Sequence, residues 1–99
     1  MGLLVTVLSQ AAMSGKSFVC KQAREALRRI QAALEQAGAE LAHVVRNCVY
    51  VTDISRWQEV GQAHGEVFGG IRPATSMIEV SRLIEPALLV EIEADAIVP

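Results

Sequence analysis

Hydrophobic residues recur along the chain with two different spacings. Residues 3–8 (LLVTVL) and 44–52 (VVRNCVYVT) are short runs rich in β-branched and apolar side chains, which is typical of strands. Residues 75–80 and 88–97 predict two more strands, separated by a connection that contains Pro86. The pattern therefore predicts four strands.

Between the first two strands, apolar residues follow the i, i+3, i+4, i+7 spacing of a helix buried on one side. The residues of this stripe are Ala23, Ala26, Leu27, Ile30, Ala33, Leu34 and Ala37. We expect the helix over about residues 20–37, with Gly38 as its C-cap. Ser14, Gly15, Lys16 and Ser17 predict a turn before it.

A second helix is predicted between the second and third strands. Residues 55–58 (SRWQ) fit a capping box, so the helix should begin near Ser55, and Gly69-Gly70 should end it. Its buried stripe would comprise Trp57, Val60, His64, Val67 and Phe68. The order β-α-β-α-β-β, with both helices on one face of the sheet, predicts a single α+β domain over residues 1–99.

The last strand predicts which residues lie on each face of the sheet, because side chains of a strand alternate. Facing the helices we expect Val90, Ile92, Ala94 and Ala96, together with Ile78 and Val80. On the opposite face we expect Glu91, Glu93, Asp95, Leu89, Ile97, Met77 and Glu79, with Tyr50 as a further candidate. In the second strand, Val49 and Val51 point one way, and Cys48, Tyr50 and Thr52 point the other. A face open to solvent and a subunit interface both fit these residues, and the mixture of apolar and acidic side chains favours the interface.

Composition supports association. Hydrophobic residues make up 52% of the chain and the mean hydropathy is +0.33, whereas a domain of this size leaves roughly a third of its surface exposed. We therefore expect a homo-oligomer. The net charge of −2 argues against a nucleic-acid partner, and no apolar run approaches the roughly 20 residues of a membrane span.

The two cysteines, Cys20 and Cys48, form no CxxC pair. With no sequence resembling a secretion signal, we expect a cytoplasmic protein with reduced thiols. His43 and His64 are isolated, so no metal site is predicted. Cys48 has no neighbouring base in sequence, so a buried structural role is favoured over a nucleophilic one.

Five segments resemble the reactive-intermediate deaminase (YjgF/RidA) family. They are residues 21–30 (KQAREALRRI), 34–38 (LEQAG), 49–53 (VYVTD), 72–80 (RPATSMIEV) and 89–96 (LVEIEADA). The resemblance implies a chorismate-mutase-like α+β fold and a homotrimer whose sheets face inward, with three clefts between subunits. It also implies hydrolysis of reactive enamines and imines to keto acids and ammonia, without a cofactor.

The resemblance further implies roles for particular residues. A glutamate of the E-I-E motif positions the attacking water, which makes Glu91 the expected catalytic residue. The family arginine of the P-A-R-S motif, which holds the substrate carboxylate, is replaced by Thr75. The expected substrate-binding residues are therefore Arg72, Thr75, Ser76 and Met77, with Arg72 the nearest substitute cation. The alternative is a non-catalytic trimer that binds a small metabolite or a protein in the same clefts.

Overall fold

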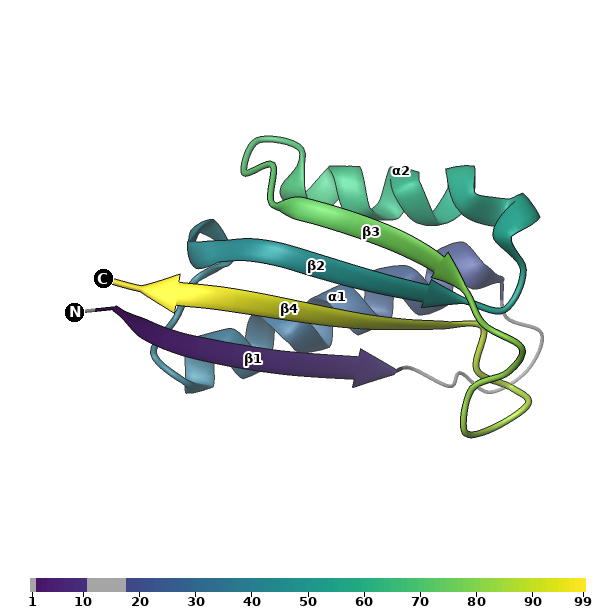
Figure 1. Cartoon of the computed structure of the whole chain (residues 1–99), viewed down its shortest axis with the longest axis horizontal. Helices are drawn as coiled ribbons and strands as arrows, with labels where there is room; N and C mark the ends of the chain where they lie inside the picture. Colours follow the sequence, from purple (N-terminus) through teal and green to yellow (C-terminus); the bar gives the residue numbers. More distant parts are fainter. Residues whose placement is uncertain (1, 11–17) are drawn as a thin grey trace.

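Four strands form one mixed sheet in the computed structural model, which describes residues 2–10 and 18–99 (Figure 1). The strands are β1 (Leu3–Gln10), β2 (Val44–Val51), β3 (Ala74–Glu79) and β4 (Val90–Val98). Their order across the sheet is β1-β4-β2-β3. The central strand β4 is antiparallel to both of its neighbours, and β2 and β3 are parallel.

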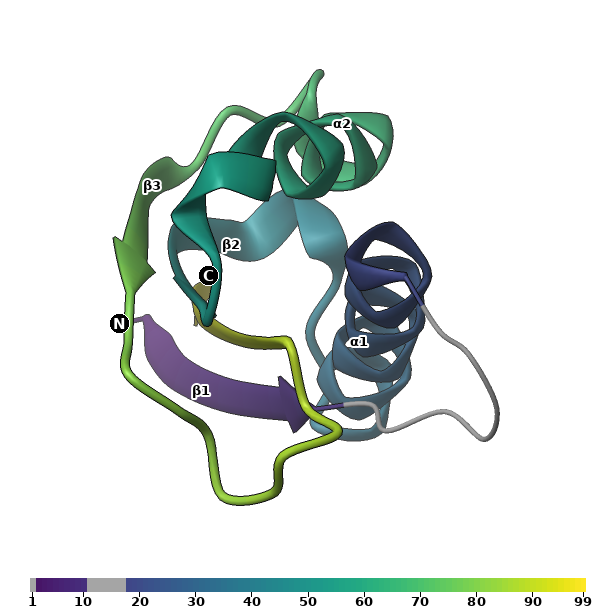
Figure 2. The ribbon, with the colours of Figure 1, turned by 90° about the vertical axis from the view of Figure 1, so that its right-hand side faces the viewer.

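Helices α1 (Val19–Gln36) and α2 (Trp57–Phe68) cover one face of the sheet, and no helix of the described residues covers the other, which is called the uncovered face below (Figure 2). Most of the predicted stripe of α1 is buried, and Leu27, Ile30 and Leu34 are almost fully inaccessible. Ala33 is only partly buried, and Ala37, which follows the end of the helix, is exposed. Gly38 follows the helix with φ +82°, which a glycine adopts without steric cost. The predicted α+β fold is therefore confirmed.

The beginning of the second helix differs from the prediction. The predicted capping box at Ser55 is absent, and a 3-10 turn (Ile54–Arg56) precedes α2. Asp53 caps this turn instead, because its Oδ1 accepts hydrogen bonds from the backbone N and the hydroxyl of Ser55. The turn shifts the start of the helix, and Trp57, predicted to be buried, is 54% exposed.

The faces of β3 are the reverse of those predicted. Met77 pairs with Val49, and Glu79 pairs with Val51, so both lie on the helix side of the sheet. Ile78 pairs with Tyr50 and lies on the uncovered face. The prediction was wrong because every residue of β3 is exposed or only partly buried, so its hydrophobic pattern does not specify which face is which.

The assignment for β2 and β4 is confirmed. Val49, Val51, Val90 and Ile92 are buried under the helices, and Glu91 lies on the opposite face because it pairs with Tyr50. The turn predicted at residues 14–17 lies outside the described residues. In the described part of the chain, no helix is both long and apolar enough to cross a membrane.

Candidate functional site

Glu91 lies in a row of four paired residues that crosses the uncovered face near one end of the sheet. Gln10 pairs with Glu91, Glu91 pairs with Tyr50, and Tyr50 pairs with Ile78. The side-chain Nε2 of Gln10 donates a hydrogen bond to Oε1 of Glu91. Oε2 of Glu91 accepts no hydrogen bond from any described residue, so this oxygen is available to an incoming molecule.

The next row contains a buried thiol beside a carboxylate. Cys48 pairs with Glu93 and is only 2% exposed, although it lies on the face that the helices do not cover. The hydroxyl of Tyr50 donates to Oε2 of Glu93 over 3.4 Å. The hydrogen bond with Cys48, burial and the charge of Glu93 raise the pKa of Tyr50 to about 12, so the phenol remains a donor at neutral pH.

Asp95 has a polar contact with each of the two neighbouring strands. Its Oδ1 accepts a hydrogen bond from Thr6 at 2.8 Å, and its Oδ2 lies 3.4 Å from a guanidinium nitrogen of Arg46. Glu91 and Glu93 have no arginine partner among the described residues, so this end of the face is the more acidic one.

Large apolar side chains surround these carboxylates. Leu4 is 65% exposed and Leu8 is 57% exposed, while Ile78 and Ile97 are each almost half exposed. Leu8 pairs directly with Glu93, and Leu4 pairs with Ile97. Several large apolar side chains exposed on one face favour an interaction surface there.

The structure separates the predicted substrate-binding residues. Ser76 pairs with Cys48 and shares the uncovered face with Glu91, whereas Met77 and Thr75 lie on the helix side, where Thr75 pairs with Asn47. The Thr75 hydroxyl donates to the backbone oxygen of Pro73 at 3.0 Å. Of the predicted substrate-binding residues in β3, Ser76 alone therefore shares the face of Glu91 within one chain.

Arg72 lies at the opposite end of the sheet from Glu91. It occupies the turn before β3 with φ +57°, and its backbone N donates to Phe68 O at 2.8 Å. Ala74, where β3 begins, is four residues before Ile78, which is about 13 Å at the rise of a strand. The side chain of Arg72 therefore does not share the row of Glu91 within one subunit.

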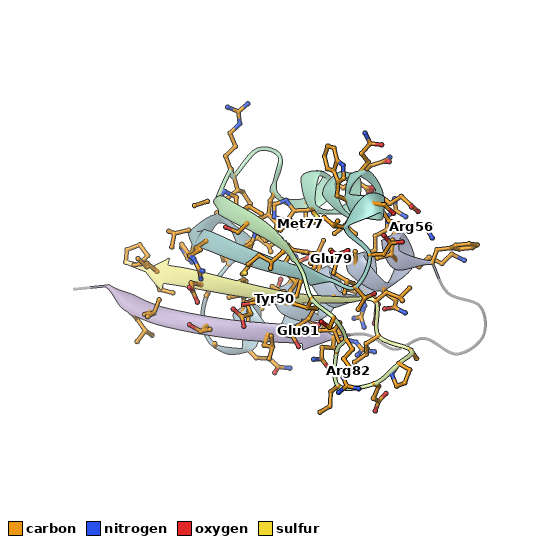
Figure 3. The ribbon with its side chains drawn as sticks, turned by 45° about the vertical axis from the view of Figure 1, so that its right-hand side comes forward. Tyr50, Arg56, Met77, Glu79, Arg82 and Glu91 are labelled. Carbon is orange, nitrogen blue, oxygen red and sulfur yellow. The ribbon has the colours of Figure 1, made fainter. Side chains whose placement is uncertain are left out.

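The connection between β3 and β4 lies at the same end of the sheet as Glu91. The connection leaves β3 through Val80, whose backbone N donates a hydrogen bond to Val51 O at 2.8 Å. It then runs past the sheet on the side opposite to the helices (Figures 1 and 2). Arg82 belongs to this connection and is drawn beside the Glu91 end of the sheet in Figure 3. Arg82, Leu83, Ile84 and Pro86 line a hollow of about 550 Å³.

Gln22 of α1 ties the end of this connection to the domain. Its Nε2 donates to Ala87 O at 2.8 Å, and its Oε1 accepts from the backbone N of Leu89 at 2.8 Å. Gln22 is 1% exposed, and both bonds are partly buried. The side-chain amide of Gln22 thus holds the segment that leads into β4, and so helps to position Glu91 near the start of that strand.

Two other polar features lie outside the row of Glu91. A small hollow of about 90 Å³ is lined by Val19, Thr52, Asp53, Arg56 and Leu89. On the helix side, Nδ2 of Asn47 lies 2.8 Å from Nε2 of His64, whose pKa is lowered by burial. Within the described ranges, His, Cys, Asp and Glu form no group of three that could hold a metal ion.

Sequence reasoning missed the two glutamines. Gln10 lies beyond the predicted end of the first strand, and Gln22 lies in the predicted helix outside its apolar stripe. The first could have been found by extending the strand by two residues, which places Gln10 on the face of Thr6 and Leu8. No comparable sequence signal marks Gln22, because its partners are backbone groups more than sixty residues away.

Comparisons with known proteins agree with this architecture. The family model described as Endoribonuclease L-PSP matches residues 6–98. A RutC family protein of Pyrococcus abyssi is 37% identical over 81 residues, which cover 82% of this chain and 63% of that protein. A RutC family protein of Pyrococcus horikoshii is 38% identical, with 64% of its length covered. The match thus spans less than two thirds of these curated relatives.

Solved structures extend the likeness to three dimensions. Rv2704 of Mycobacterium tuberculosis, described as a member of the highly conserved YjgF/YER057c/UK114 family, superimposes with a TM-score of 0.91 at 56% identity, covering 99% of this chain and 81% of that one. NMB1025 of Neisseria meningitidis, from the YjgF protein family, gives 0.85 at 26% identity, covering 97% and 80%. The chain belongs to the YjgF/RidA family, whose model matches almost all of it.

Proposed function

We propose that this protein hydrolyses reactive 2-imino acids and their enamine tautomers to 2-keto acids and ammonia, in clefts between the subunits of a homotrimer. The observation that carries the proposal is the state of Glu91. Its carboxylate is fixed through one oxygen by Gln10, and its other oxygen is available on a face that this chain leaves uncovered.

The chemistry requires one carboxylate and one water. A proton from solvent, added to the enamine at carbon or to the imine at nitrogen, gives the iminium. Water then adds to the iminium carbon while Glu91 accepts one of its protons, giving a neutral carbinolamine. Glu91 returns this proton to the nitrogen, and the C–N bond breaks as the hydroxyl group loses its proton to solvent, so the keto acid and ammonia leave and Glu91 is again ionised. No electrons are transferred to or from the protein, so no redox cofactor is required.

The trimer is supported by the uncovered face. Leu4, Leu8 and Ile97 would be removed from water by neighbouring copies, and burial of apolar surface contributes about 25 cal/mol per Å². The edge strand β3 also has one side without a partner strand, since it is last in the sheet. A neighbour packed along β3 would place Thr75, Ser76 and Met77, with Arg72 before them, along the wall of a cleft.

Two further points belong to the proposal. Both cysteines are free, which fits a reducing compartment, and we therefore place the activity in the cytoplasm. The description of the matching family model names an endoribonuclease. The carboxylates of Glu91 and Glu93 disfavour that activity here, because this face would repel a phosphate backbone.

The test is the rate of 2-iminopropanoate decay with wild-type protein, Glu91→Gln and Glu93→Gln. We expect Glu91→Gln to lose at least about 100-fold, the contribution of a general base. Glu93→Gln is the matched control because it removes a carboxylate from the neighbouring row, and we expect its rate within a few-fold of wild type. Equal rates for wild type and Glu91→Gln would reject the mechanism.

The second candidate is a trimer that binds a small keto acid without turning it over. The replacement of the motif arginine by Thr75 favours it, since threonine cannot offer a charge or two parallel hydrogen bonds to a carboxylate. Binding of pyruvate by a wild-type protein that does not accelerate imine decay would support this candidate.

A further inference from the structure

We propose that Arg82, on the connection between β3 and β4, is the cation that holds the carboxylate of the ligand beside Glu91. The inference rests on the proposed function, because it assigns a substrate-binding residue to the same site. Neither Thr75 nor Arg72 fills this role within one subunit: Thr75 is on the helix side, and Arg72 lies at the far end of β3.

The acidic face creates the need for such a cation. An imino or keto acid carries a negative charge, and a ligand approaching Glu91 meets Glu93 in the next row of the same face. Like charges at this separation repel one another, so a productive complex requires a positive group near Glu91. Arg46 is the arginine within the sheet, and it is already paired with Asp95.

Two arginines of the described chain form no ion pair with a carboxylate, and these two are the candidates for the cation that binds the ligand. Arg24, Arg28, Arg29, Arg46 and Arg56 each form an ion pair with a carboxylate. Arg72 and Arg82 form none with any residue that the structure describes. Both are exposed, but Arg82 is at the Glu91 end of the sheet, where the connection passes on the side opposite to the helices (Figure 3).

The surroundings of Arg82 suit a small amphipathic acid. The guanidinium can offer two parallel N–H groups to a carboxylate. Leu83, Ile84 and Pro86 complete the hollow of about 550 Å³ with apolar surface, and Ile84 is 83% exposed. A 2-imino or 2-keto acid with an alkyl side chain has both of the groups that this lining would contact.

Binding of pyruvate and of pyruvamide, followed by calorimetry, tests the assignment, because the amide has the same shape without the charge. The proteins are wild type, Arg82→Gln, Arg82→Lys and Arg28→Gln. We expect Arg82→Gln to raise the Kd for pyruvate at least tenfold and to leave the Kd for pyruvamide unchanged. Arg82→Lys should recover part of the loss, and the Arg28 variant should stay within twofold of wild type.

Three results would overturn the assignment. They are an unchanged Kd for pyruvate in Arg82→Gln, an equal loss for pyruvate and pyruvamide, or no pyruvate binding by the wild type at millimolar concentration. The proposed hydrolysis is tested independently, by comparing the turnover of 2-iminopropanoate by wild type and Glu91→Gln. That variant should bind pyruvate at least as tightly as wild type, since it removes a negative charge next to the ligand.

Discussion

The two faces of the sheet are built from the same four strands but have different tasks. On the helix side, Val90, Ile92 and Ala94 of β4 are fully buried and belong to the hydrophobic core. On the other side of the same strand, Glu91, Glu93 and Asp95 alternate with them and lie among exposed leucines and isoleucines. The alternate side chains of β4 thus contribute to the core of the domain on one face and to its candidate site on the other.

The comparison shows where stability and function reside. The helix-covered face is completed by this chain alone, because α1 and α2 supply the second layer that a sheet needs. The uncovered face has acidic groups held by Gln10, Thr6 and Tyr50, but its apolar residues have no covering layer. Substitutions on the first face should change folding, and substitutions on the second should change association and ligand binding.

The largest effect is expected for Leu8→Asp on the uncovered face. It places a charge beside Glu93 and removes apolar area from the proposed interface, in every subunit at once. We expect sedimentation equilibrium to give the mass of one chain instead of three. Gln31→Asp, which adds the same charge on exposed α1, should keep the mass of the wild type. A Leu8→Asp protein with three chains would exclude this face as the interface.

The next effect is expected for Ile92→Ala on the helix-covered face. Ile92 is fully buried, so truncation leaves a cavity and should lower the free energy of unfolding by about 2–5 kcal/mol. Urea denaturation at fixed protein concentration measures it. Ile84→Ala, at an exposed position, should change this free energy by less than about 0.5 kcal/mol. Equal losses for the two variants would contradict the assignment of the core.

Gln22→Ala should have a smaller effect that links the two faces. It leaves the partly buried carbonyl of Ala87 and N–H of Leu89 without this side-chain partner, at a cost of about 1–3 kcal/mol. Urea denaturation again measures the loss, and pyruvate binding should weaken because the connection that contains Arg82 is released. Gln31→Ala on the same helix is the control, and an equal loss there would show that helix propensity causes the effect.

The smallest effect is the pH dependence that His64 confers. Burial lowers the pKa of His64 in the folded chain below that in the unfolded chain, so unfolding takes up a proton. The stability contributed by the neutral ring is complete above about pH 6.5, and it decreases as the pH falls through the folded-state pKa. Thermal unfolding at pH 8 and pH 5 should show this decrease, and His64→Gln should reduce it. An unchanged decrease would assign the titration to other groups.

Prediction from the sequence succeeded where a segment is strongly patterned. The stripe of α1 and the alternation of β4 each have one fully apolar side, so only one orientation buries them. The carboxylate side of β4, and thus the position of Glu91 on the uncovered face, followed from the same alternation. The failures fell in β3 and at the start of α2, where exposed positions such as Trp57 and Ile78 offer no such constraint.

The sequence by itself determined the two helices, the four strands, the face of Glu91 and the likeness to the YjgF/RidA family, because each depends on local periodicity or on matched motifs. Only the tertiary structure decided that Gln10 holds Glu91, that Gln22 fixes the connection into β4, and that Arg82 lies at the Glu91 end of the sheet while Arg72 does not. These relations join residues far apart in the chain, and their geometry depends on strand order and register.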